Sequence, residues 1–168
     1  EGFDIDIRIG EVTEPDVVAH LVTRNARILC AAPAYLARRG HPRSLGDLAN
    51  HDCLLYRERH QPFGEWRLQG PEGTETVKIT GPMGSNHSDI TRNWCLEGRG
   101  VLLLAVWDVA QHLRDGSLVR VLPAWHQPAD VWAVTATRAG ASGKLRQCLD
   151  FLVRELRSGP YALESMPV

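Results

Sequence analysis

Apolar and polar residues alternate along the first part of the chain in the pattern of a half-buried strand. Residues 3–9 place apolar side chains at every second position between Asp and Arg residues, and Gly10 follows them. A period of two predicts a strand with one buried face. Further apolar stretches predict strands at residues 26–32, 53–56, 101–105, 118–122 and 131–138.

Helices are predicted between these strands from capping residues and from apolar positions three or four apart. Ser44 and Asp108 are suited to cap the helices that follow them, and Pro33 is suited to a first helical turn. One predicted helix places Ile90 and Trp94 on the same face. The predicted helices cover residues 34–39, 45–50, 88–97, 109–115 and 143–158, the last after Ser142 and with a stripe of Leu145, Cys148, Leu149, Leu152 and Leu156.

One hairpin interrupts this order of strands and helices. Residues 64–69 and 74–80 flank a turn at residues 70–73 that has Pro and Gly where a tight turn needs them. Repeated strand–helix units predict an α/β protein with mostly parallel sheets. The chain has no low-complexity linker, so a division into two lobes requires strands that cross between the lobes.

Composition excludes several classes of protein. The 168 residues carry a formal charge of −1, which does not suit a free-standing nucleic-acid-binding module. No segment approaches the roughly 20 apolar residues of a membrane span. The chain opens without Met and without the pattern of a signal peptide, and we expect it to be a fragment of a longer protein.

The four cysteines form no CxxC pair, which argues against a zinc ribbon and a thioredoxin-like motif. Each lies in an apolar stretch, where a free Cys acts as a small hydrophobic residue. We therefore expect reduced core cysteines in a cytosolic protein. The seven histidines show no metal-binding spacing, so no metal and no cofactor are predicted.

Two segments resemble catalytic or phosphate-binding motifs without matching them. The sequence GASGK at residues 140–144 has the wrong glycine spacing for a phosphate-binding loop, and a loop with a helix cap explains it better. Residues 85–89 contain Ser, His and Asp, but a catalytic triad is assembled from distant segments. The sequence therefore predicts no enzyme.

The start of the helix after His87 is the most suggestive feature. Asn86, His87 and Ser88 are all polar, and the first turn of a helix has free backbone N–H groups that attract anions. Ordinary capping of the helix needs only one of these residues. The residues alone leave anion binding and plain capping equally open.

Taken in order, several phrases resemble the effector-binding domain of LysR-type transcriptional regulators. The resemblance extends from Asp4 to about Leu156, and its specificity lies in the order and spacing of the set. The phrases are DIDIRIGE, RILCAAPAYLARRGHPRSLGDLANHDCLLYR, FGEWRLQGPEGTETVKITGPMGSNHSDITRNWCLEGRGVLLL, WDVAQHLRDGSLVRVLPAW, VWAVTATR and KLRQCLDFLVREL.

The resemblance implies a fold like that of type 2 periplasmic binding proteins, with two α/β lobes joined by two crossover strands. The crossovers are expected near residues 29–32 and 133–137. Residues 1–29 and 136–168 would form part of lobe I, and residues 30–135 would form lobe II. The DNA-binding helix-turn-helix of the family and the opening part of lobe I have no counterpart in these 168 residues. The sheet of such an incomplete lobe would be exposed.

The resemblance also implies a site for a small metabolite, often a carboxylate, between the lobes. Asp6 is unusual in its strand, and we expect Arg8 to pair with it. His87 stands where the family commonly has Asp, which favours an anion. The implied effector contacts are Arg8, Gly10, Glu11, Asn86, His87, Ser88, Thr135 and Thr137.

These implications predict the ligand-sensing part of a cytoplasmic bacterial regulator that performs no chemistry. It would act as a homo-oligomer and reach DNA only through a domain that these 168 residues lack. The main alternative is a solute-binding protein of a transport system with the same cleft. A small α/β hydrolase is a third class, but the sequence supplies no nucleophile for it.

Overall fold

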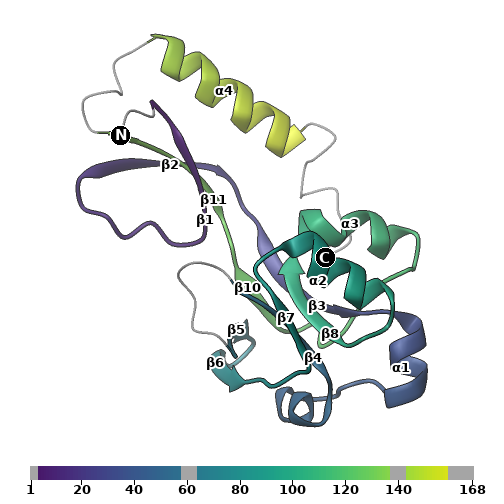
Figure 1. Cartoon of the computed structure of the whole chain (residues 1–168). Coiled ribbons are helices and arrows are strands. Elements are labelled where there is room, and N and C mark those ends of the chain that lie inside the picture. The colour runs from purple at the N-terminus through teal and green to yellow at the C-terminus, as the bar shows by residue number, and fades with distance from the viewer. Residues whose placement is uncertain (1–3, 58–63, 137–142, 159–168) are drawn as a thin grey trace. The chain divides into compact units, whose positions relative to one another are not determined.

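The computed structural model describes residues 4–57, 64–136 and 143–158 (Figure 1). The chain divides into two compact units. Unit 1 comprises Glu1–Ala26 and Pro128–Met166, and unit 2 contains Arg27–Gln127. Unit 2 begins three residues before the segment expected for lobe II and ends eight residues before the end of that segment.

Unit 1 is built on an antiparallel sheet of three strands with the order β1 (Asp6–Ile9), β11 (Val131–Ala136) and β2 (Val17–Thr23). The helix α4 (Gly143–Ser158) packs against β2, and Arg157 on α4 donates to the backbone oxygens of Val22 and Leu21 at 2.8 and 3.1 Å. The strand β1 lies at an edge of the sheet. Its two isoleucines, Ile7 and Ile9, are 47% and 44% exposed, so only part of this sheet is covered.

Unit 2 is built on an eight-stranded sheet with the order β6-β5-β10-β3-β8-β4-β7, in which β9 pairs with β3. Three helical segments, α1, α2 and α3, and the 3-10 helix η1 belong to it (Figure 1). The bounds are β3 (Ala26–Ala31), α1 (Pro33–Arg39), η1 (Leu45–Asn50), β4 (Cys53–Tyr56), β5 (Glu65–Gly70), β6 (Gly73–Lys78), β7 (Met83–Ser85), α2 (Ser88–Leu96), β8 (Val101–Ala105), α3 (Val106–Arg114), β9 (Val119–Arg120) and β10 (His126–Pro128).

The expectation of mostly parallel sheets is wrong. Among the strand pairings of known direction, only β4–β7 and β4–β8 are parallel. The hairpin β5–β6 is antiparallel, and β3 runs antiparallel to β8. Parallel strands need a crossover connection. The strands β7 and β8 both run parallel to β4 from either side of it, and α2 forms the crossover that joins them.

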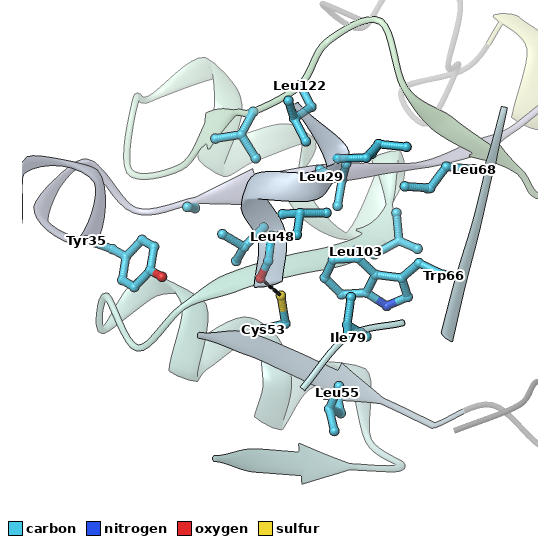
Figure 2. Packing of buried hydrophobic residues seen from close by; sticks show 14 of the residues in the cluster. Leu29, Tyr35, Leu48, Cys53, Leu55, Trp66, Leu68, Ile79, Leu103 and Leu122 are labelled. Atoms are coloured by element: carbon cyan, nitrogen blue, oxygen red, sulfur yellow. Dashed lines mark hydrogen bonds between the residues drawn. The ribbon is translucent and has the colours of Figure 1, made fainter. Parts of the chain in front are cut away.

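The core of unit 2 lies between the sheet and the segments α1 and η1. Figure 2 shows Leu29 of β3, Leu48 of η1, Leu103 of β8 and Trp66 of β5 in one cluster, all nearly fully buried. Each buried leucine of this kind contributes roughly 1.5–3 kcal/mol relative to an exposed one. None of the described helices is long and apolar enough to cross a membrane.

Several predicted elements differ in their details. In α2 the buried residues are Thr91 and Cys95, whereas Ile90 is 42% exposed, so the predicted Ile90–Trp94 face is not the core face. The helix α3 begins at Val106, and Asp108 lies in its first turn instead of capping it. The strands β2, β7 and β10 were not predicted from the sequence. Three predicted features lie outside the described residues: Phe3, positions 137 and 138 of the last predicted strand, and the helix cap at Ser142.

A buried tyrosine ties α1 to the segment before β4. Tyr35 is fully buried, and its hydroxyl accepts the backbone N–H of Asp52 at 2.9 Å and lies 3.0 Å from Nδ1 of His51. Because the hydroxyl oxygen already accepts from Asp52, its proton is free to be donated to Nδ1. This bond needs a neutral His51. Burial, followed by the charge of Arg39, lowers the pKa of His51, while Asp47 and Asp52 act in the opposite direction.

This arrangement predicts a pH dependence of stability. The unfolded histidine titrates near 6.5 and the folded one at a lower pH, so the stabilisation is complete above about pH 6.5 and is lost as the pH falls through the folded pKa. The free energy of unfolding, measured with urea between pH 7.5 and 5, should therefore fall more steeply for the wild type than for His51→Asn. Asn retains an acceptor but does not titrate. Parallel pH profiles would contradict the assignment.

Two glycines allow neighbouring segments to approach the start of β4. A Cβ on Gly81 would lie 1.7 Å from the backbone oxygen of Cys53, and a Cβ on Gly100 would lie 2.2 Å from that of Asp52. The two approaching segments lead into β7 and β8, the strands that flank β4. These close approaches therefore help to hold the parallel part of the sheet together.

Gly81→Ala should destabilise the protein by about 3 kcal/mol or more, because the added methyl group meets backbone and cannot move aside. Gly143→Ala is the matched control, since a Cβ there meets nothing within 4 Å. Urea unfolding of both variants tests this expectation. A Gly81→Ala variant as stable as the control would show that the approach is looser than the structure has it.

The expectation of core cysteines holds for three of the four. Cys30, Cys53 and Cys95 are free and fully buried, but Cys148 is free and exposed. Of the five residues of its predicted stripe, α4 fully buries only Leu145, so this helix covers the sheet with a narrower face than its sequence suggests. Burial raises the pKa of the Cys53 thiol to about 12.

Thiol reactivity should separate these residues. An aromatic disulfide reagent at pH 8 should react with one thiol, that of Cys148, in the native protein and with all four after unfolding, because only thiolates attack it. Cys148→Ser should abolish the native reaction. Rapid reaction of a second thiol in that variant would contradict the burial of the other three.

Candidate functional site

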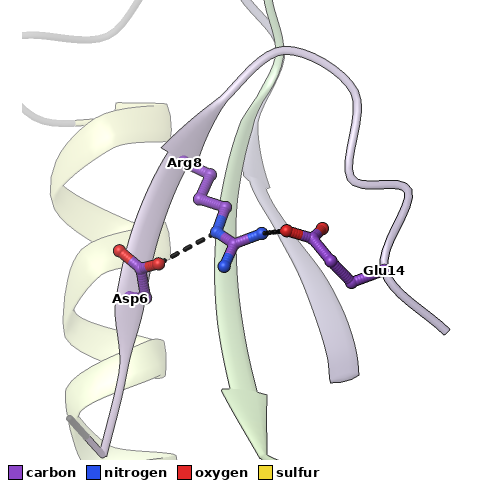
Figure 3. Close-up of polar contacts among 3 residues, drawn as sticks. All are labelled: Asp6, Arg8 and Glu14. Carbon is purple, nitrogen blue, oxygen red and sulfur yellow. Dashed lines mark hydrogen bonds and ion pairs between the residues drawn. The ribbon is translucent and has the colours of Figure 1, made fainter. Parts of the chain in front are cut away.

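In unit 1, the predicted effector contact Arg8 lies between two carboxylates (Figure 3). Its Nε donates to Oδ2 of Asp6 at 2.9 Å, which confirms the predicted Asp6–Arg8 pair. Its Nη1 donates to Oε1 of Glu14 in the loop between β1 and β2. These two acids were not predicted as site residues, although Glu14 is only six positions along the chain from Arg8.

The pairing sets the electrostatics of this part of unit 1. Hydrogen bonds from Arg8 to Asp6 and to Glu14 raise the pKa of the guanidinium. Hydrogen bonding by its own backbone N–H and by Arg8 lowers the pKa of Glu14. One cation and two anions leave a local charge of −1. Arg8 can therefore pair with an external anion only by sharing or releasing an internal carboxylate.

The other predicted residues near β1 contribute backbone geometry and an exposed charge. Gly10 has a φ of 96°, a conformation that favours glycine, and its N–H donates to the oxygen of Asp130 at 2.8 Å. This bond fixes the point at which β1 becomes a loop. Glu11 follows in that loop and is exposed.

Thr135 is placed in the interior of unit 1 by β11, opposite Val18 of β2. It is 2% exposed, and its Oγ1 has no hydrogen-bond partner among the described residues. A hydroxyl in such a place is unusual, because buried polar groups are nearly always paired. Thr137 lies outside the described residues.

In unit 2, the predicted contacts Asn86, His87 and Ser88 form the junction between β7 and α2. Asn86 and His87 are exposed and Ser88 is half-buried. His87 is the N-cap of α2, but its side chain makes no capping bond. Its backbone N–H instead donates to Oγ of Ser85 at 3.1 Å. The His87 side chain therefore does not compete with an anion for the amide N–H groups of the first turn of α2.

This junction lies at the carboxyl edge of the parallel strands, which we define by the last residues of β4, β7 and β8: Tyr56, Ser85 and Ala105. Tyr56 is opposite Ser85, and the next N–H, that of Arg57, donates to the oxygen of Ser85 at 2.9 Å. Ligands of open α/β sheets bind at this type of edge. Tyr56 and Arg57 were not among the predicted site residues, although Tyr56 is the last residue of the strand predicted at 53–56 and Arg57 is the next one.

Two acidic residues, Asp89 and Asp108, lie at the starts of α2 and α3. Burial raises the pKa of Asp108, while the charge of Arg92 and a hydrogen bond from Trp107 act against this shift. Arg92 donates to Oδ1 of Asp89 at 2.7 Å. The first turns of α2 and α3 therefore each carry an acid, Asp89 and Asp108, and Arg92 partly neutralises them.

Within each unit, only predicted residues that are neighbours in the sequence are shown together, and no contact of the described residues joins Thr135 or Glu11 to Arg8. Asn86, His87 and Ser88 are continuous at the carboxyl edge, and Arg8 and Gly10 lie along one strand end. Among residues 4–57, 64–136 and 143–158, no group of three or more His, Cys, Asp or Glu side chains could hold a metal ion. The arrangement offers polar and charged contacts for a small molecule.

Comparison with solved structures defines the class of the fold. The regulatory domain of CrgA, a LysR-type transcriptional regulator from Neisseria meningitidis, matches with a TM-score of 0.75 and 30% identity over 91% of this chain and 75% of that one. The regulatory domain of AphB from Vibrio vulnificus matches with a TM-score of 0.74 and 27% identity over 90% and 74%. The chain is thus an α/β domain with the fold of type 2 periplasmic binding proteins.

The family model described as LysR substrate binding domain matches residues 1–157, so the chain belongs to the LysR substrate-binding-domain family. It is 46% identical to the HTH-type transcriptional regulator DmlR of Escherichia coli over 90% of this chain and 50% of that protein. It is 43% identical to the HTH-type transcriptional activator TtdR of Escherichia coli strain K12, over 90% of this chain and 49% of that protein. The chain spans about half the length of these relatives. They are regulators, and the family is not one of enzymes.

Proposed function

We propose that this chain is the effector-sensing domain of a LysR-type transcriptional regulator and that it binds a small organic acid between two lobes. Unit 1 would be the partial lobe I and unit 2 would be lobe II. The observation that carries the proposal is the exposed junction Asn86–Ser88 at the carboxyl edge, in a chain of this family. Arg8, Gly10, Glu11, Thr135 and Thr137 remain proposed contacts on the side of lobe I.

The chemistry of the junction suits a carboxylate. The first-turn N–H groups of an α-helix point along its axis, and the exposed residues Asn86 and His87, which directly precede α2, have side chains that can donate hydrogen bonds. A helix N-terminus alone stabilises an exposed anion by only about 0.3–1 kcal/mol. Most of the binding free energy must therefore come from further contacts. We propose as one of them Arg57, the residue after β4 whose backbone N–H donates to the oxygen of Ser85.

Control of transcription would follow from a difference in affinity. An effector shifts a domain between two arrangements only if it binds one of them more tightly. We infer that the intact protein is a cytoplasmic homo-oligomer whose DNA-binding segment lies outside these 168 residues. The relatives and solved structures named above are regulators, which supports this function over solute transport.

A thermal-shift screen tests the effector site. Small aliphatic and aromatic carboxylates at about 100 times Kd should raise the Tm of the chain by roughly 5–10 °C. His87→Ala and Asn86→Ala should each reduce that shift, because each removes a donor at the junction. His41→Ala, at an exposed histidine of unit 2, is the matched control and should keep the full shift.

Two results would count against the proposed site. One is a shift of equal size in the wild type and in both junction variants, which would place the acid elsewhere. The other is the absence of any shift with every acid tested, which would remove organic acids as the effector class for this chain.

A further inference from the structure

The large sheet of unit 2 has a second buried face, opposite the core formed with α1 and η1. Leu29 of β3 and Leu103 of β8 belong to that first core. Because successive side chains of a strand point to opposite faces, their neighbours Cys30 and Leu102, which are paired in the ladder, face the other side of the sheet. Both are fully buried there, and α2 packs against β8 and β4. A thiol therefore lies on the face of the sheet that α2 covers.

The helix α2 brings a second thiol to Cys30. Thr91 and Cys95 are its two buried residues. The Cys95 thiol lies 3.6 Å from the backbone oxygen of Cys30 and 3.6 Å from that of Gly100. A hydrogen bond between the two thiols, followed by burial, raises the pKa of Cys30 well above its usual value. Two thiols from distant parts of the chain are thus neighbours inside unit 2.

Neighbouring thiols are the reactants of a disulfide. The bond requires a sulfur–sulfur distance of about 2.05 Å and Cβ atoms roughly 3.5–4.5 Å apart. The Cys95 sulfur already lies against the backbone of Cys30, so rotation of the two side chains is the movement that the bond requires. Cys53 is equally buried, but its thiol donates to the backbone oxygen of Leu48 at 3.8 Å. Pairing, and not burial alone, distinguishes Cys30 and Cys95.

The packing of α2 allows a small oxidant to reach the pair. The helix has nine residues and fully buries two of them. Elements with few buried contacts open locally at a smaller free-energy cost than global unfolding. Hydrogen peroxide is only slightly larger than water, whereas an aromatic disulfide reagent is far larger. Slow reaction of these thiols with the large reagent is therefore compatible with their oxidation by a peroxide.

We propose that Cys30 and Cys95 form a dithiol site that a peroxide converts into a disulfide, which fastens α2 to β3. The Cys95 sulfur attacks one oxygen of hydrogen peroxide and the O–O bond breaks. Cys95 becomes a sulfenic acid, and its proton leaves with the departing hydroxide as water. The Cys30 sulfur then attacks the Cys95 sulfur, the S–O bond breaks, and the departing hydroxide takes the Cys30 proton as a second water. Two electrons pass from the thiols to the peroxide.

The raised pKa of Cys30 sets the order of these steps, because a thiol that keeps its proton is the poorer nucleophile. Cys95 therefore attacks the peroxide, and Cys30 resolves the sulfenic acid. The inference concerns a modification of unit 2 alone and does not depend on the proposed effector.

Peptide mapping after oxidation tests the pair. The Cys148→Ser chain, which lacks the exposed thiol, is treated with hydrogen peroxide, then unfolded in urea, alkylated and digested with trypsin. Cleavage after arginine gives the peptides 28–38 and 93–99, and each holds one thiol of the pair. They should be recovered joined to each other. The thiols of the unfolded chain should fall from three to one, and dithiothreitol should restore them.

Cys53→Ala in the same background is the matched control, because it removes a buried thiol outside the pair. It should form the cross-link as readily as its parent, whereas Cys95→Ala should form none. Oxidation should also slow hydrogen exchange of the α2 amides by roughly tenfold, because a helix fastened to the sheet opens less often. This last measurement uses no variant within the pair, so it stays informative if Cys95→Ala does not fold.

Three outcomes would overturn the proposal. Recovery of the two peptides unlinked, with both thiols alkylated, would mean that peroxide does not reach the pair. A sulfinic acid at Cys95 without a cross-link would mean that the Cys30 sulfur cannot resolve the sulfenic acid. Cross-links that include Cys53 in similar amount would mean that oxidation proceeds from the unfolded chain. The experiment contains no effector, so its result is independent of the thermal-shift screen.

Discussion

The close approach of backbone to backbone at the start of β4 is the constraint on which the candidate site depends. Gly81 and Gly100 lie against the carbonyl groups of Cys53 and Asp52, where any side chain would collide with the backbone. This packing places β4 between β7 and β8 in a parallel arrangement. The three strands then end at one edge, and the exposed junction of β7 and α2 is presented there because the strands below it are fixed.

The predictions from the sequence succeeded where a local pattern determined the structure. The period of two in residues 3–9 predicted β1 and placed Asp6 and Arg8 on one face, and the predicted ion pair is confirmed. Ser44 caps η1 as its sequence indicates. The predictions failed where the tertiary environment decides. The strand β2 has no alternating pattern because its burial changes along its length, and Cys148 is exposed although its helix is amphipathic.

In the candidate site, too, the local features could be predicted from the sequence and the tertiary contacts could not. The position of Asn86 and His87 at a helix start could be predicted, because helix caps are local features. The residues that lie next to this helix start could not be predicted, because the pairing of Tyr56 with Ser85 depends on the register of the strands. The buried and unpaired hydroxyl of Thr135 and the carboxamide of Asn25 carry no sequence signal at all. Their burial arises from segments more than 100 positions away in the chain.

The two carboxylates around Arg8 amount to an internal competitor for any acid that approaches it. Glu14 is tethered to Arg8 by a short loop, and a tethered group acts at an effective concentration of about millimolar. A free acid that pairs with Arg8 must outcompete this group, so one carboxylate of ordinary affinity gains little there. A molecule with a second anchoring group elsewhere would overcome the competition, so an effector contact at Arg8 would favour ligands that are bound at more than one point.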